Sequence, residues 1–178
     1  MIGEPRLDIG NIKKSEEQKL TILEKVNKSL ADLGSTAKWK RAPEFLEEYK
    51  PLRGKTLVMI DDVKKLLEHF APNLMVATDG NASFVEYTDQ DPDKLVKQIM
   101  QHNPDIVIID YHLSDYLKGS SVIESLKEKN FSGKVIGFSS DNDTVKAFMN
   151  AGAIGTVEKD ASQPEKSVTE MANLISKE

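Results

Sequence analysis

The chain has 178 residues, of which 39% are hydrophobic and 30% are charged, and its formal net charge is −5. This length and composition fit one domain with a buried core and an appendage. Cysteine is absent, which excludes disulfides, thiolate metal sites and a cysteine nucleophile. No apolar run has transmembrane length and the N-terminus has no secretory signal, so we expect a cytoplasmic protein without a membrane partner.

Charge is distributed unevenly along the chain. Residues 1–55 hold 12 Lys+Arg and 9 Asp+Glu, whereas residues 56–178 hold 12 and 20. The pattern of apolar residues also changes near Gly54, where a regular alternation of elements begins. We therefore expect a helical N-terminal extension over residues 1–54 and a domain of different character over residues 55–178.

The extension is expected to contain one long helix. Residues 1–14 lack periodicity and are expected to be loosely ordered, and Ser15-Glu16-Glu17-Gln18 matches a capping box that would begin the helix. Gly34 would end it. One narrow apolar stripe runs along the helix, formed by Leu23, Val26, Leu30 and Leu33. This stripe fits either a helical dimer or a helix packed on its own domain, and both interpretations stay open.

Two short features follow this helix. Lys38-Trp39-Lys40-Arg41 places basic residues around an aromatic side chain, a pattern found in nucleic-acid contacts. Because the cluster is small and the whole chain is acidic, we regard nucleic-acid binding as unfavoured. Pro43 is then expected to start a short helix over residues 44–49, and Pro51 to end it.

From Lys55 onward, apolar strands alternate with amphipathic helices. Strands are expected at 56–60, 74–78, 106–110, 134–138 and 153–157. Helices are expected at 63–70 and at 91–102, and a third is expected to begin at Ser120 or Ser121. A fourth, with Val145, Phe148 and Met149 facing inward, would end at Gly152. A fifth would follow a cap at Ser162. Residues 81–90 are expected to form an inserted hairpin or elaborated loop. Five such units predict a doubly wound α/β fold, a flavodoxin-like parallel sheet of strand order 2-1-3-4-5 with the helical extension in front.

Polar side chains stand at the carboxyl ends of these strands. Asp61 and Asp62 follow the first strand, Asp110 ends the third, Ser139 follows the fourth and Lys159 follows the fifth. In this strand order, the carboxyl ends meet in one crevice. Clustered carboxylates suit a hard divalent cation, Mg²⁺ above all. A cation, an ammonium and a hydroxyl around one carboxylate suit an incoming phosphoryl group.

These motifs resemble the receiver domain of response regulators in two-component signalling. The matching pieces are Met59-Ile60-Asp61-Asp62, Ile108-Ile109-Asp110, Ile136-Gly137-Phe138-Ser139-Ser140, and Gly152-Ala153 followed by Glu158-Lys159. The resemblance covers residues 55–177. Each motif is weak alone, but their order and their positions at strand ends make the combination specific.

The resemblance implies a role for each strand-end residue. Asp110 would be the phosphoacceptor, and Asp61, Asp62 and Asp110 would bind Mg²⁺ together with the backbone carbonyl of His112. Ser139 and Lys159 would contact the phosphoryl group. A histidine kinase or a histidine phosphotransfer protein would be the phosphodonor, and the protein would be a regulatory phosphoacceptor in a phosphorelay rather than an enzyme.

The sequence departs from the family pattern at four positions. Thr156 stands where an aromatic switch residue is usual, Asp160 and Ser114 replace prolines, and Gly119 comes one residue late. The phosphorylation chemistry therefore looks intact, whereas the aromatic readout does not. Asp110-Tyr111-His112 also begins like a cobalamin-binding motif, but Asp115 occupies the glycine position, so we interpret His112 as a loop residue.

Output is expected through protein–protein interaction, by way of the extension or the face formed by the fourth helix, fifth strand and fifth helix. A homodimer through the N-terminal helix is one possibility. Two alternatives stay open: a pseudo-receiver that binds partners independently of phosphate, and a Mg²⁺-dependent phosphotransferase that acts on an external substrate.

Overall fold

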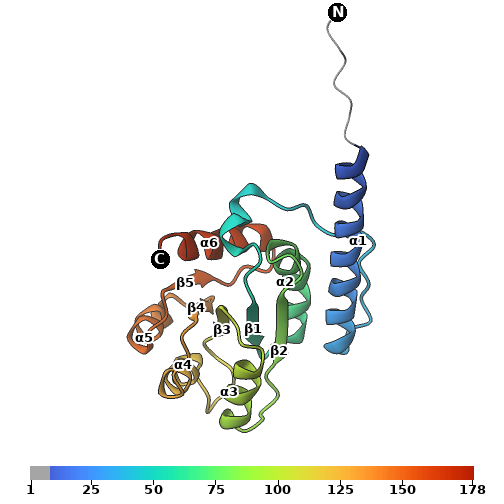
Figure 1. The fold of residues 1–178 in the computed structure, drawn as a ribbon. Helices are drawn as coiled ribbons and strands as arrows, with labels where there is room; N and C mark the ends of the chain where they lie inside the picture. The colour runs from blue at the N-terminus through green and yellow to red at the C-terminus, as the bar shows by residue number, and fades with distance from the viewer. Residues whose placement is uncertain (1–8) are drawn as a thin grey trace, which may run out of the picture.

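Five parallel strands form the centre of the molecule (Figure 1). The computed structural model describes the backbone of residues 9–178 and the side chains of residues 21–178. The strands are β1 (Leu57–Asp61), β2 (Ala82–Glu86), β3 (Ile106–Asp110), β4 (Lys134–Ser139) and β5 (Gly155–Glu158). Their order in the sheet is β2-β1-β3-β4-β5, which confirms the predicted flavodoxin-like topology.

Helices cover both faces of the sheet. They are α1 (Ile9–Asp32), α2 (Lys64–Ala77), α3 (Pro92–Gln101), α4 (Gly119–Glu128), α5 (Val145–Ala151) and α6 (Pro164–Ser176). Two short 3₁₀ helices, η1 (Glu47–Leu52) and η2 (Asn142–Thr144), precede β1 and α5. No helix in the described part of the chain combines the length and the apolar character that a membrane crossing requires.

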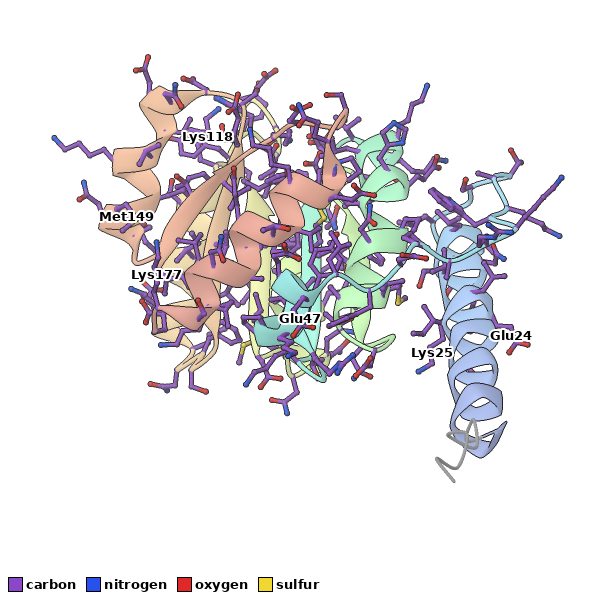
Figure 2. The ribbon with its side chains drawn as sticks, turned by 90° about the horizontal axis from the view of Figure 1, so that it is seen from above. Glu24, Lys25, Glu47, Lys118, Met149 and Lys177 are labelled. Atoms are coloured by element: carbon purple, nitrogen blue, oxygen red, sulfur yellow. The ribbon has the colours of Figure 1, made fainter. Side chains whose placement is uncertain are left out.

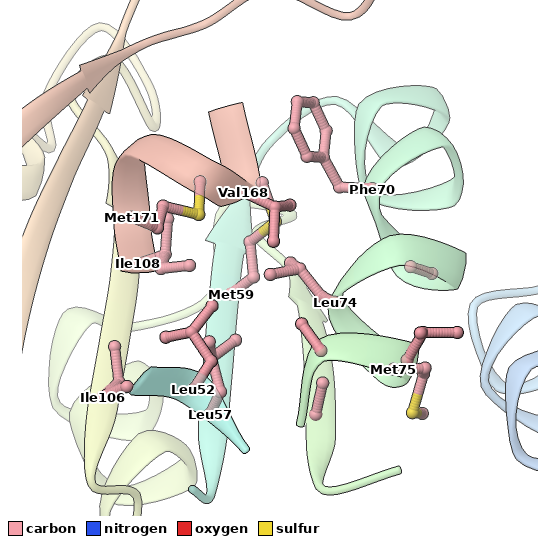
Figure 3. Close-up of a cluster of buried hydrophobic side chains, with 14 of the residues drawn as sticks. Leu52, Leu57, Met59, Phe70, Leu74, Met75, Ile106, Ile108, Val168 and Met171 are labelled. Carbon is pink, nitrogen blue, oxygen red and sulfur yellow. The ribbon is translucent and has the colours of Figure 1, made fainter. Parts of the chain in front are cut away.

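Alternation along β1 divides the core into two clusters. Leu57 and Met59 face the side covered by α2, α6, η1 and α1, while Val58 and Ile60 face the side covered by α3, α4 and α5. Figure 3 shows the first cluster, where Met59 lies between Leu74 of α2 and the side chains of α6. A strand buried on both faces needs the continuous apolar run that the sequence contains.

The second predicted strand is wrong. Residues 74–77 are the last turn of α2, and the strand is formed by residues 82–86, where a hairpin or loop was expected. The cause is burial on two sides: residues 71–78 are all buried, because α2 lies between the sheet and α1. A helix buried all round loses the polar stripe that normally identifies it. Edge strand β2 is only partly buried and therefore carries polar residues.

Helix α1 packs on the domain of its own chain. Ile22, Val26 and Leu30 are buried in the cluster that contains α2. Figure 2 shows Glu24 on the side of α1 that faces away from the sheet and Lys25 on the side that faces it. Val26 and Leu30 of the predicted stripe are thus buried, whereas Ile22 takes the buried position that was predicted for Leu23.

The predicted start of α1 is wrong. The helix begins at Ile9, so the capping-box residues 15–18 lie within it, and residues 9–14 are helical rather than loose. A capping box is a local signal that its surroundings can override. Residues 1–8 lie outside the described part of the chain. The end of the helix is as predicted, with Gly34 at a φ of 75°.

Three other local predictions need correction. The helix expected at 44–49 is the 3₁₀ helix at 47–52, which contains Pro51, because Leu46 is extended. Helix α4 begins at Gly119 without a side-chain cap, so neither Ser120 nor Ser121 caps it. In α5 only Phe148 of the three predicted residues is buried, since 37% of Val145 and 45% of Met149 are exposed.

Candidate functional site

Three carboxylates converge at the carboxyl edge of the sheet. Asp61 ends β1, Asp62 follows it, and Asp110 ends the neighbouring strand β3, where Ile60 pairs with Ile109. One oxygen from each of the three carboxylates lies within 4.8 Å of the others. Asp61 is fully buried and Asp110 is 4% exposed, whereas Asp62 faces solvent. We call these three residues the acidic cluster.

Lys159 joins the two buried members of the acidic cluster. Its Nζ lies 2.7 Å from Asp61 Oδ2 and 2.9 Å from Asp110 Oδ1. The backbone holds it there, because the Lys159 N–H donates to the carbonyl oxygen of Ser139 and so extends the pairing of β4 and β5. The ammonium also lies 5.6 Å from the ring centroid of Phe138, and only 16% of the side chain is exposed. The lysine is therefore held in place rather than mobile in solvent.

Burial and charge shift the acid–base behaviour of this pair. Burial raises the pKa of Asp61 to about 6, and Lys159 opposes that rise. Burial alone would lower the pKa of the Lys159 ammonium, but the carboxylates of Asp61 and Asp110 outweigh it and raise this pKa. Lys159 thus stays charged at neutral pH and contacts two of the three carboxylates of the acidic cluster.

The acidic cluster has the composition of a divalent-cation site. Asp61 Oδ1 accepts a hydrogen bond from the Val63 N–H at 2.8 Å. The buried Asp61 Oδ2 accepts no hydrogen bond in the described part of the chain, and its contact is the ion pair with Lys159. Oxygen atoms of this kind, grouped within a few ångströms, suit a hard cation. The residues therefore fit Mg²⁺, which would add positive charge where Lys159 alone is insufficient.

The structure brings the acidic cluster and Lys159 together, but Ser139 is turned toward its own loop. Its Oγ accepts a hydrogen bond from the Asp141 N–H at 3.1 Å. His112 lies on the loop after Asp110, with its exposed ring 3.2 Å from Lys118 Nζ. The histidine ring thus contacts the loop itself.

Gly119 is a site residue whose role the sequence does not reveal. A Cβ at this position would lie 2.1 Å from the backbone carbonyl oxygen of Asp110, a distance that no side chain tolerates. The Gly119 N–H also donates to the carbonyl of Tyr111 at 2.7 Å. The start of α4 therefore lies directly against the backbone of Asp110 and Tyr111, and only glycine permits this approach.

The structure shows the surroundings of two residues that depart from the family pattern, Asp160 and Thr156. Asp160 replaces the usual proline, and its carboxylate accepts hydrogen bonds from the Ser162 N–H and hydroxyl, which stabilise the turn after Lys159. These bonds also lower the pKa of Asp160. Thr156 pairs with Gly137 in the sheet, so neither residue supplies an aromatic ring there.

A cavity of about 390 Å³ opens beside Asp62. Its lining comes from the loops after β1, β2 and β3, and includes Asp62, Tyr87, Asp89, Leu113, Ser114, Asp115 and Tyr116. Three of these side chains are acidic, so anions that approach from this direction meet repulsion unless a cation is bound.

Comparison with known structures supports the fold. The BeF3-activated DrrB receiver domain has a TM-score of 0.54 and 21% identity, over 68% of this chain and 97% of that one. A LuxR-family DNA-binding response regulator from Staphylococcus aureus has a TM-score of 0.53 and 21% identity, over 69% and 97%. The receiver domain of the histidine kinase CKI1 from Arabidopsis thaliana, complexed with Mg²⁺, has a TM-score of 0.53 and 14% identity, over 68% and 94%.

Sequence comparison identifies the family. A search of curated protein sequences found no match. The family model of the response regulator receiver domain, however, matches residues 57–170, which is more than half of the chain. The match includes the acidic cluster and Lys159. The chain therefore belongs to the response regulator receiver domain family.

Proposed function

We propose that this protein accepts a phosphoryl group on Asp110 in two-component or phosphorelay signalling. The observation that supports this most directly is the position of Lys159, in contact with both Asp61 and Asp110 beside the exposed Asp62. A buried carboxylate next to a fixed cation and two further carboxylates has the parts that phosphoryl acceptance requires.

In the proposed reaction, an oxygen of Asp110 attacks the phosphorus of a phosphohistidine. The P–O bond forms while the P–N bond breaks, and the electron pair of that bond leaves with the donor imidazole. Mg²⁺ held by Asp61, Asp62, Asp110 and the backbone carbonyl of His112 would neutralise charge on the phosphoryl oxygens. Lys159 would neutralise a further oxygen, and Ser139 would turn from Asp141 to donate a hydrogen bond.

Partners and organisation belong to the same proposal. The donor would be a histidine kinase or a histidine phosphotransfer protein, and output would use a protein partner. Residues 1–54 would act as a helical extension of a receiver domain at 55–178, with a homodimer through α1 as one mode of output. Deleting residues 1–50 is expected to change the oligomeric state or partner binding; if neither changes, the extension has no part in output.

Intact-mass spectrometry tests the acceptor directly. After incubation with Mg²⁺ and acetyl phosphate, the wild-type protein should gain one labile phosphoryl group, and Asp110→Asn should gain none. Addition to both proteins would place the acceptor elsewhere. Addition to neither would direct the next measurement to beryllofluoride, which mimics the phosphoryl group without a donor.

Thr156 favours one alternative function. A pseudo-receiver would keep the fold and bind partners without phosphate, and the missing ring at Thr156 is compatible with it. Failure of beryllofluoride to bind would favour this alternative. The phosphotransferase alternative would require turnover of an external phosphate ester, which release of inorganic phosphate would detect.

A further inference from the structure

The segment between α1 and η1 presents an exposed basic loop, Lys38-Trp39-Lys40-Arg41. All four residues face solvent, and 39% of the Trp39 side chain is exposed. Among the described residues, none forms an ion pair with Lys38, Lys40 or Arg41. The basic loop therefore displays a large aromatic side chain among three positive charges that no described side chain pairs.

The side chain of Asn27 holds the basic loop on α1. Asn27 Nδ2 donates to the carbonyl oxygen of Trp39 at 3.1 Å, and the Trp39 N–H donates to Asn27 Oδ1 at 2.8 Å. Asn27 lies one position after Val26, which is buried against the domain. The backbone of Trp39 is thus fixed relative to the domain core, so a partner would meet an ordered surface and lose less entropy on binding.

Tryptophan and arginine are the side chains most often responsible for binding energy at protein interfaces. Positive charges around such an anchor complement carboxylates of a partner. We propose that the basic loop binds an acidic segment of another protein, with an apolar side chain of that segment against Trp39 and its carboxylates beside Lys38, Lys40 and Arg41. Because the loop lies outside residues 57–170, this proposal does not depend on phosphoryl acceptance by Asp110.

Charge favours a protein segment over a nucleic acid. Binding to a nucleic acid without base contacts depends on the number of phosphates neutralised, and three cations release few counterions. Residues 56–178 carry 12 basic and 20 acidic residues, so the domain behind the loop repels a long polyanion. A short acidic segment carries fewer negative charges than a long polyanion and so meets less of this repulsion.

Trp39 is the only tryptophan in the chain, so its fluorescence reports directly on the basic loop. The probe is a synthetic peptide of glutamates around one central leucine, added to the full-length protein. Comparison peptides replace the glutamates with glutamine, or the leucine with serine, and a single-stranded oligonucleotide represents the nucleic-acid alternative. We expect the glutamate–leucine peptide to shift the Trp39 emission to the blue and to bind at least about tenfold more tightly than either comparison peptide.

Matched variants assign the binding to the loop. Combining Lys38→Gln, Lys40→Gln and Arg41→Gln should weaken binding of the glutamate–leucine peptide by about tenfold or more. The control combines Lys94→Gln, Lys97→Gln and Lys129→Gln, which removes three other exposed lysines and should leave binding unchanged. Asn27→Ala should weaken binding without changing the charge of the loop.

Several outcomes would overturn the proposal. Unchanged Trp39 emission at about 1 mM peptide, or equal affinity for the glutamate and glutamine peptides, would exclude an acidic ligand at the loop. An equal loss of affinity in the control variant would show that only total charge matters. Tighter binding of the oligonucleotide would assign the loop to nucleic acid, and a change of oligomeric state in the loop variant alone would assign it to a second copy of the chain.

Discussion

Lys159 Nζ lies 2.7 Å from Asp61 Oδ2, and the Asp61 side chain is completely buried. The ion pair is therefore shielded from water, unlike the exposed pair of Lys134 and Glu178 on the surface. Removing one member of a buried pair leaves an uncompensated charge in the interior, which costs far more free energy than losing a surface pair.

The first prediction concerns the loss of this cation. Lys159→Met should lower the free energy of unfolding by about 2–4 kcal/mol without divalent cations, because Asp61 and Asp110 then repel each other. Mg²⁺ should restore part of the loss, while phosphorylation by acetyl phosphate should become slower. Urea unfolding with and without Mg²⁺ measures the first effect, and Lys134→Met is the control, with an expected change below about 1 kcal/mol. Equal effects of the two substitutions would contradict the buried ion pair.

The second prediction follows from the pKa of Asp61, which burial raises from 3.8 to about 6. The folded state holds this proton more tightly than the unfolded chain does. The stabilising contribution is therefore complete below the unfolded value of 3.8 and is lost as the pH rises through about 6. Without divalent cations, this one group should cost the folded state about 3 kcal/mol by neutral pH.

Urea unfolding of wild type and Asp61→Asn across this pH window measures that cost. The asparagine variant lacks the titrating group, so it should gain stability relative to wild type as the pH rises. Mg²⁺ should reduce the difference, because it favours ionised Asp61. A difference between the two proteins that stays constant with pH would show that the pKa of Asp61 is not raised.

The third prediction tests the close approach of Gly119 to Asp110. Gly119→Ala would place a Cβ 2.1 Å from the Asp110 carbonyl oxygen, so the loop after Asp110 or the start of α4 must move. We expect a stability loss of about 1–3 kcal/mol and a slower rate of phosphorylation by acetyl phosphate. Ser120→Ala, at the next position, should change neither the midpoint of unfolding nor the rate. A normal rate in Gly119→Ala would show that the loop geometry does not matter.

The fourth prediction concerns the attachment of α1. Val26→Ala removes buried methyl groups between α1 and the domain, and should lower the free energy of unfolding by about 1–3 kcal/mol. Hydrogen exchange should accelerate in α1 while phosphorylation of Asp110 stays unchanged. Glu24→Ala, on the exposed side of the same helix, is the control. If exchange accelerates equally in α1 and the sheet, the helix and the domain unfold as one unit.

Sequence patterns identified four of the five strands because β1 and β3 are continuous apolar runs, and because β4 and β5 are short, largely apolar segments that end in polar residues. The alternation of these strands with helices then predicted the sheet order. Strand β2 was missed for a physical reason: it lies at the edge of the sheet, where Ser83 and Glu86 are partly exposed. The run at 74–77 resembled a strand because α1 buries the outer side of α2. Local propensity cannot report a contact made by a helix more than forty residues earlier in the chain.

Much of the candidate site follows from strand ends alone. Asp61, Asp62, Asp110 and Lys159 lie together because parallel strands present their carboxyl ends at one edge. The role of Gly119 and the two hydrogen bonds of Asn27 could not be predicted in this way. The role of Gly119 and the hydrogen bonds of Asn27 both depend on how closely two segments of the folded chain approach each other. No pattern of residues in the sequence indicates that distance.

The double burial of α2 has a consequence for building chimaeras. A helix that covers one face of a sheet usually has a polar outer side, and such a helix in place of α2 would offer α1 no apolar surface to pack against. Conversely, transferring residues 55–178 of this protein onto a different protein would leave the outer side of α2, including Met75, uncovered. The two helices should therefore be exchanged between proteins together, as a single module.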